Sequence, residues 1–154
     1  MRVLLQRVTR ASVTVDGIVI GKIDQGLLAL VGIGHDDDVA RAERMAAKVV
    51  ELRIFEDDAG RMNRSLRDIC ELPDANAGML VVSQFTLYAD VRKGRRPSVT
   101  DAAPPDLARR LVDHFADTAR ALEVPVASGQ FGAHMKVTLD NDGPVTIWID
   151  SADL

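Results

Sequence analysis

The sequence contains a single cysteine, Cys70, and no long apolar run. One cysteine excludes a disulfide within the chain and a cysteine-rich zinc site, and it fits a reducing compartment. The longest uncharged, mostly apolar run, Gly26 to Gly34, is about half as long as a membrane-crossing helix. Residues Met1 to Arg7 also lack the apolar stretch of a secretory signal. We therefore expect a cytoplasmic protein with no membrane partner.

Metal-ligand, nucleotide and hydrolase motifs are also missing. The three histidines are scattered without a helical ligand pair: His35, His114 and His134. Gly32 to Gly34 is only a fragment of a dinucleotide fingerprint, and the aspartates that follow would repel a pyrophosphate. Ser83 is not in a Gly-x-Ser-x-Gly elbow. We expect no metal and no cofactor.

What the sequence does contain is enough apolar material for one folded domain. The 154 residues are 47% hydrophobic, and 19 Lys and Arg against 23 Asp and Glu give a net charge of -4. This length fits one domain covering residues 1–154, and this apolar content argues against disorder.

Periodicity predicts a mixed α/β fold. Arg2 to Ile23 alternates around Asp16-Gly17, which is typical of a β-hairpin, and Leu27 to Ile33 reads as a central strand. Asp36 to Asp38 favours the start of a helix, and Pro104-Pro105 opens a second one. Further expected strands lie at 53–56, 78–88, 124–126, 135–139 and 145–149, whereas 61–76 is expected to be loop. The prediction is a mixed, partly barrel-like β-sheet with two main helices.

Two polar clusters stand out, and each also has a plain structural interpretation. Val81 to Tyr88 is a hydrophobic strand that ends in hydroxyl and amide groups, which suits either a ligand site or a strand reaching solvent. Ser83 and Thr86 meet in one site only if the chain bends between them. Asn141 to Thr146 is rich in turn residues, and its pattern by itself favours a hairpin turn.

A third feature is basic. Arg92 to Arg96 carries four cations in five residues of an acidic protein, so it is either a phosphate-binding patch or a solvated loop.

The two clusters resemble the two signature motifs of the D-aminoacyl-tRNA deacylases. Ser83 to Leu87 (SQFTL) is similar to the first motif and Asn141 to Thr146 (NDGPVT) to the second. Other segments resemble family segments in the same order, so the likeness covers nearly the whole chain: 6–13, 61–63, 96–98 and 131–135. His134 departs from the pattern, and Glu71 to Ala77 is a slightly long loop.

The resemblance implies a reaction and a site. The reaction is hydrolysis of the ester that joins a D-amino acid, or glycine, to the 3′ end of tRNA. The partner is a second copy of the chain, so that each active site in the homodimer combines segments of both subunits. The residues implied as catalytic are Ser83, Gln84, Phe85 and Thr86. The residues implied in substrate binding are Gly143, Pro144, Asn141, Thr146, Met135 and Arg7.

The resemblance also implies how the site works. In the family the Gly-Pro bond, here Gly143-Pro144, is cis, and its carbonyls face the partner's pocket as a wall that rejects L side chains and admits glycine. Backbone N–H groups near Phe85 and Thr86 are expected to bind the oxyanion, and the substrate's 2′-hydroxyl replaces a missing general base.

Two other functions stay open from the residues alone. A nucleic-acid-binding module without catalysis would rest on the basic loop and on Arg2, Arg7 and Arg10. A small esterase would use Ser83 as its nucleophile.

Overall fold

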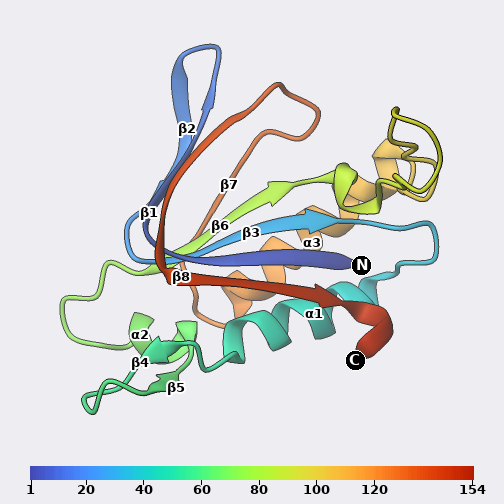
Figure 1. Cartoon of the computed structure of the whole chain (residues 1–154). Coiled ribbons are helices and arrows are strands. Elements are labelled where there is room, and N and C mark those ends of the chain that lie inside the picture. Colours follow the sequence, from blue (N-terminus) through green and yellow to red (C-terminus); the bar gives the residue numbers. More distant parts are fainter.

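The computed structural model describes residues 1–154 and is built on one six-stranded sheet. β1 (Arg2–Val15) pairs with three other strands, which are β2 (Ile18–Ile23), β3 (Gly26–Gly32) and β8 (Lys136–Asp150). β6 (Gly78–Ser83) runs parallel to β3, and β7 (Val126–Ser128) runs parallel to β6. The strands curl so that the β1–β2 hairpin and β8 rise together above the sheet (Figure 1).

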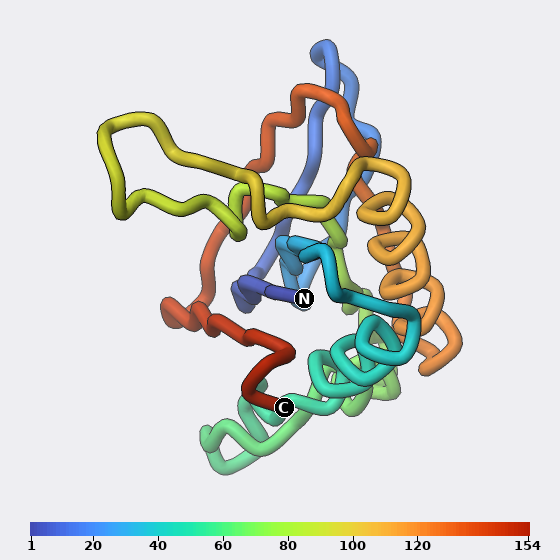
Figure 2. Tube along the Cα trace, turned by 90° about the vertical axis from the view of Figure 1, so that its right-hand side faces the viewer, coloured from blue at the N-terminus to red at the C-terminus, as the bar shows by residue number.

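The two long helices cover one face of this sheet. α1 (Val39–Glu51) begins after Asp38, whose side chain accepts a hydrogen bond from the Arg41 amide, and α3 (Pro105–Ala121) begins at a proline. Figure 2 shows both helices on the same side of the sheet. Their apolar stripes meet the odd-numbered residues of β1 and β3 in the main core.

A second, smaller core fills the curled half of the sheet. It joins Val8, Ala11 and Val13 of β1 to Leu28 of β3 and to β6. The predicted hairpin is confirmed, because Asp16 and Gly17 both have positive φ values, 49° and 79°, at its turn. The mixed, partly barrel-like architecture is therefore as expected from the sequence.

One segment expected to be loop is structured. Residues 61–76 contain β5 (Met62–Arg64), which pairs with β4 (Phe55–Glu56), and the short helix α2 (Leu66–Cys70). Ser65 and Asp68 form a reciprocal capping box at the start of α2. The loop prediction was wrong because a five-residue helix is too short to show a periodic apolar face.

The hairpin turn that the pattern of Asn141 to Thr146 favours was also wrong. β8 is one strand from 136 to 150, and both of its halves pair antiparallel with β1. Val8 lies opposite Asn141 and Gln6 lies opposite Thr146, so β1 advances two residues while β8 advances five. The three extra residues (5 − 2 = 3) form a large β-bulge, whose turn-forming composition is the same as that of a hairpin.

Candidate active site

The SQFTL segment lies where β6 ends. β6 stops at Ser83, the Gln84 amide donates to the Val31 carbonyl at 2.8 Å, and the chain then turns into the short 3-10 helix η1 (Phe85–Tyr88). The strand expected over 78–88 is thus six residues long and followed by a bend. The chain therefore bends between Ser83 and Thr86, as a site shared by these two residues requires.

The η1 turn is held from behind by Arg2 and Tyr88. Arg2 Nη1 donates to the Leu87 carbonyl at 3.0 Å, and the guanidinium carbon lies 4.3 Å from the Tyr88 ring centroid. The Tyr88 hydroxyl donates to Asp37 Oδ2 at 3.4 Å. Burial, with the Asp37 carboxylate next in effect, raises the pKa of Tyr88 above its usual range. The phenol therefore stays protonated and keeps this bond at all physiological pH values.

Two backbone amides, those of Phe85 and Thr86, come first in this turn. Neither donates to a loop carbonyl or to a side chain. The first amides of a helical turn lack partners in general, because their acceptors would precede the helix. Two neighbouring free donors suit an oxygen that develops negative charge.

A cavity of about 600 Å³ opens beside the turn. Eleven of its 16 lining residues are hydrophobic, and no Asp, Glu, Lys, Arg, Cys or Tyr is among them. His134 is the one histidine in the lining. The cavity therefore suits an uncharged group with apolar faces, and the chain supplies no carboxylate base within it.

The predicted catalytic segment reaches the cavity only in part. Ser83, Gln84 and Phe85 line it, together with Met135 from the predicted substrate-binding set. Thr86 does not line it, and its hydroxyl accepts a hydrogen bond from the Gln84 side-chain amide. Phe85 is 56% exposed.

Most of the other cavity walls were not assigned to a site from the sequence, although residues 131–135 belong to a segment that resembles the family. They come from the ends of β3 and β6, from the segment that enters α3, and from the loop before β8. These residues are Ile33, Val82, Val99, Ala102, Ala103, Pro105, Ala108, Phe131, Gly132, Ala133, His134 and Val137. The one available signal was the small-residue run Ala102-Ala103 before the prolines, which leaves open space where α3 begins.

The remaining predicted residues gather at the bulge in β8. Asn141 Nδ2 donates to the Arg7 and Val145 carbonyls, at 2.9 and 3.0 Å, and Thr146 Oγ1 donates to Asn141 Oδ1 at 3.3 Å. These bonds close the bulge at its base. The cis Gly143-Pro144 peptide lies at its tip, outside the β1–β8 register.

Arg7 supports this bulge from beneath. Its side chain is 7% exposed, its Nη1 donates to the Ile54 carbonyl at 2.6 Å, and its Nε lies 3.0 Å from Asp142 Oδ2. Gly143 has a φ of +120°, and an added Cβ would lie 2.9 Å from Val145 Cγ2 and 3.1 Å from Arg7 Nη2. The bulge therefore has room only for glycine at position 143.

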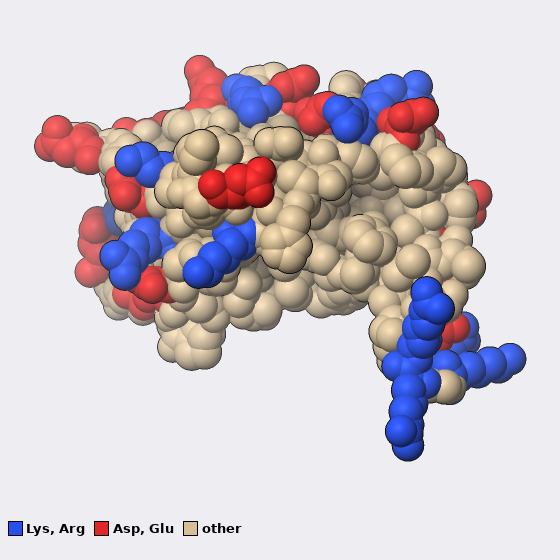
Figure 3. All heavy atoms as spheres, turned by 90° about the horizontal axis from the view of Figure 1, so that it is seen from above, with Lys and Arg blue, Asp and Glu red and all other residues tan.

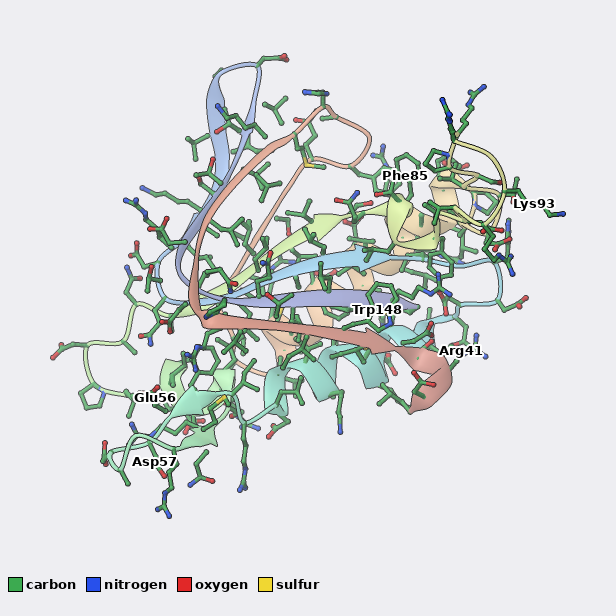
Figure 4. All side chains as sticks on the ribbon, viewed as in Figure 1. Arg41, Glu56, Asp57, Phe85, Lys93 and Trp148 are labelled. Atoms are coloured by element: carbon green, nitrogen blue, oxygen red, sulfur yellow. The ribbon has the colours of Figure 1, made fainter.

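The bulge and the cavity lie at opposite ends of the sheet. Asn141 is level with Val8, Gly26 and Gly78, where β3 and β6 begin, whereas Ser83 ends β6. Five strand steps separate the two ends, about 17 Å at 3.3 Å per residue. Figure 4 shows Phe85 at one end of the sheet and Glu56 and Asp57, on the β4 side near the bulge, at the other.

Between these ends, one sheet face lacks a covering layer. The helices cover the opposite face, and this one carries Leu4, Leu30 and Trp148, of which Trp148 is 48% exposed. Trp148 is opposite Leu4 of β1, and Figure 4 labels it between the ribbons of β8 and β1. An apolar face of this kind is typical of a surface that binds another protein.

The basic loop projects from the body of the protein next to the cavity. Its Lys and Arg side chains form a separate cluster in Figure 3. Arg92 is engaged within the loop, because its Nη2 lies 2.7 Å from Asp90 Oδ2, and this hydrogen-bonded guanidinium lowers the pKa of Asp90 to about 2. Lys93, Arg95 and Arg96 form no ion pair within the chain, so three cations stay available.

Neither a metal cluster nor a membrane helix is found. No group of three or more His, Cys, Asp or Glu side chains lies close enough together to hold a metal ion. No helix of the chain is long and apolar enough to span a bilayer.

Known proteins are similar to this chain over nearly its whole length. A family model described as D-Tyr-tRNA(Tyr) deacylase matches residues 4–150. A protein of Thermomicrobium roseum named D-aminoacyl-tRNA deacylase is 66% identical over 154 residues, which is 100% of this chain and 96% of the relative.

Two solved structures share the fold. One, described as c-Myc DNA Unwinding Element Binding Protein, is 39% identical with a TM-score of 0.86, covering 97% of this chain and 98% of that chain. The other, described as a probable eukaryotic D-amino acid tRNA deacylase, has a TM-score of 0.79 at 19% identity, covering 96% of this chain and 97% of that chain.

Proposed function

This chain belongs to the D-Tyr-tRNA(Tyr) deacylase family, and we propose that the cavity beyond β6 is where it carries out the family's reaction. The chain is a hydrolase: it cleaves the ester bond between a D-amino acid and tRNA, releasing both. Glycine carried by a non-cognate tRNA is a second substrate, because glycine lacks the side chain by which enantiomers differ. The expectations of a cytoplasmic location and of no cofactor stay predictions.

One observation carries the proposal: an uncharged cavity lies next to two free backbone amides. The terminal adenosine of tRNA is uncharged apart from its phosphate, and its base has apolar faces that stack on aromatic rings such as Phe85 and Phe131. An ester held there would place its carbonyl oxygen near the Phe85 and Thr86 amides. Such donors stabilise the tetrahedral intermediate by several kcal/mol, about 2.7–4 for one oxyanion-hole donor.

The proton that water loses goes to the substrate in this mechanism. No carboxylate lines the cavity, and the Thr86 hydroxyl is already bound by Gln84. The 2′-hydroxyl of the terminal adenosine lies next to the 3′-ester, where it accepts the proton of the attacking water and passes its own proton to the departing 3′-oxygen. Ser83 and Thr86 are then positioning residues.

The bulge completes the site from a second subunit. Its tip lies about 17 Å along the strands from Ser83 of the same subunit, by strand spacing, so it reaches a cavity only in another copy. The uncovered face with Leu4, Leu30 and Trp148 lies between the two ends and provides the contact. In a dimer with two-fold symmetry, each subunit places its bulge beside the cavity of the other.

In that arrangement the bulge is the chiral filter. Gly143 and Pro144 lie outside the ladder, so their carbonyls are available to accept a hydrogen bond from the substrate ammonium. A substrate fixed at its ester and its ammonium can direct its side chain in only one of two ways. A wall of backbone on one side admits the D form and rejects the L form.

Two alternatives rest on weaker observations. A nucleic-acid-binding module without catalysis fits the basic loop and the name of the 39% identical structure, but it leaves the cavity without a role. An esterase that uses Ser83 lacks a neighbouring base, because no carboxylate lines the cavity and Ser83 forms no hydrogen bond to His134.

The first prediction concerns stereochemistry. D-Tyr-tRNA and Gly-tRNA should be hydrolysed faster than L-Tyr-tRNA by roughly a hundredfold or more, because only the L side chain meets the bulge. Single-turnover release of the labelled amino acid measures the three rates. Equal rates for the two tyrosyl enantiomers would contradict the filter, and no release at all would favour the binding module.

The second prediction separates substrate assistance from side-chain catalysis. D-Tyr-tRNA that ends in 2′-deoxyadenosine should react roughly a hundredfold more slowly or worse, the usual scale of general base catalysis. Ser83→Ala and Thr86→Ala should each keep activity within about tenfold of the parent, as positioning changes. An inactive Thr86→Ala variant, combined with a normal rate of the parent on the deoxy substrate, would mean that a side chain and not the 2′-hydroxyl assists catalysis.

The third prediction tests the shared site by complementation. Phe85→Pro removes one donor amide at a position where the helical backbone accepts proline, and Gly143→Val fills the bulge. Each variant should be inactive alone. Exchange of the two in equal amounts should restore about a quarter of parental activity, because half of the dimers are mixed and each has one intact site.

The control for this experiment is an exchange between differently tagged subunits of the same variant, which should restore nothing. Mixed dimers that form but stay inactive would show that each site belongs to one subunit. A 16.7 kDa species at every concentration in light scattering would exclude the dimer itself.

The fourth prediction concerns the basic loop. Alanine at Lys93, Arg95 and Arg96 together should raise KM for D-aminoacyl-tRNA more than it lowers kcat, and should reduce the slope of log KM against log salt by about 2 to 3. The matched control replaces three exposed cations far from the cavity, Lys22, Arg44 and Lys48. Equal salt slopes for both triple variants would mean that the loop is merely solvated.

A further inference from the structure

Arg109 of α3 lies against a wall of the cavity. Its guanidinium carbon is 5.1 Å from the centroid of the Phe131 ring, and Phe131 lines the cavity. The neighbouring residues Pro105 and Ala108 of the same helix line it as well. The helix thus places one cation at the edge of a cavity whose lining contains no cation.

The Arg109 guanidinium forms no ion pair with the carboxylate that follows it on α3. Asp113 lies four residues further along, the spacing at which a carboxylate and a guanidinium meet. The ion pairs of α3 nevertheless join His114 to Glu43 and Arg120 to Asp117, and Arg109 forms none. Instead it lies over the Phe131 ring, and its N–H groups form no hydrogen bond or ion pair within the chain.

We propose that Arg109 binds the phosphate on the 5′ side of the terminal adenosine of tRNA. This inference rests on the proposed function, in which that adenosine occupies the cavity. Its 5′ phosphate is then the nearest anion to the cavity edge, and a planar guanidinium with free N–H groups binds phosphate in a bidentate manner. Arg109 is a substrate-binding residue separate from the basic loop, which contacts phosphates further from the ester.

A pair of minimal substrates isolates this contact. One is the 3′-O-D-tyrosyl ester of adenosine, and the other is the same ester of adenosine 5′-monophosphate. The parent should show a KM roughly tenfold lower for the phosphorylated ester, the usual worth of a charge-assisted hydrogen bond. Arg109→Ala should abolish this difference by raising only the KM of the phosphorylated ester, and Arg109→Lys should keep part of it.

Arg110→Ala is the matched control, because Arg110 is also exposed on α3, has no ion pair and stacks on no aromatic ring. It should behave as the parent does on both esters. Full-length D-Tyr-tRNA provides a second measurement, in which Arg109→Ala raises KM several-fold and Arg110→Ala does not.

The outcomes are distinct. If Arg109→Ala changes the KM of both esters equally, Arg109 acts only through its packing on Phe131, and the proposal is wrong. Equal KM values of Arg109→Ala and Arg110→Ala on full-length tRNA would overturn it as well. A parent enzyme that releases D-tyrosine from none of the three substrates would instead overturn the proposed function.

Discussion

The pairing of β8 with β1 across three inserted residues is the constraint on which the rest of this structure depends. If β8 paired with β1 without an insertion, the peptide groups of residues 142–145 would be hydrogen-bonded to β1 as in a regular sheet. The insertion pushes Gly143 and Pro144 out of the sheet, whereas Asn141 keeps the two halves of β8 in pairing by bonding to both edges of the gap. The same strand then continues to Trp148, so one element provides the bulge and part of the uncovered face.

Arg7 is the costliest part of this arrangement. A buried guanidinium loses several kcal/mol of hydration, which its contacts with Asp142 and the Ile54 carbonyl offset incompletely, since its Nε has no well-directed hydrogen bond. An apolar side chain at position 7 would avoid this cost. The Arg7 guanidinium instead connects Asp142 in the bulge to the Ile54 carbonyl before β4. The arginine is therefore explained by its role in positioning the bulge and not by a gain in stability.

The sequence predicted the elements that depend on neighbouring residues, such as turns and helix starts. Asp16-Gly17 fixed the hairpin, Asp38 and Pro105 marked the two long helices, and the Val81 to Tyr88 cluster pointed to the strand end where the cavity lies. It misjudged features that depend on distant partners. Turn residues describe a hairpin and a bulge equally well, and only the register against β1 decides between them. The cavity walls at Val99 to Ala108 and Phe131 to Val137 meet through tertiary folding, so no local pattern reveals them.

The distribution of charge separates binding from chemistry. Cations lie around the cavity, at Arg109 and in the basic loop, whereas the cavity lining itself carries no Asp, Glu, Lys or Arg. In the proposed mechanism, phosphates remote from the ester therefore supply affinity that helps to hold the reacting bond against two backbone amides. Selectivity in the proposed filter rests on backbone carbonyls, which are the same for every residue type. In the proposed site the shape of the bulge determines which enantiomer is accepted, and two residues of the predicted substrate-binding set, Arg7 and Asn141, hold that shape through their contacts within the chain.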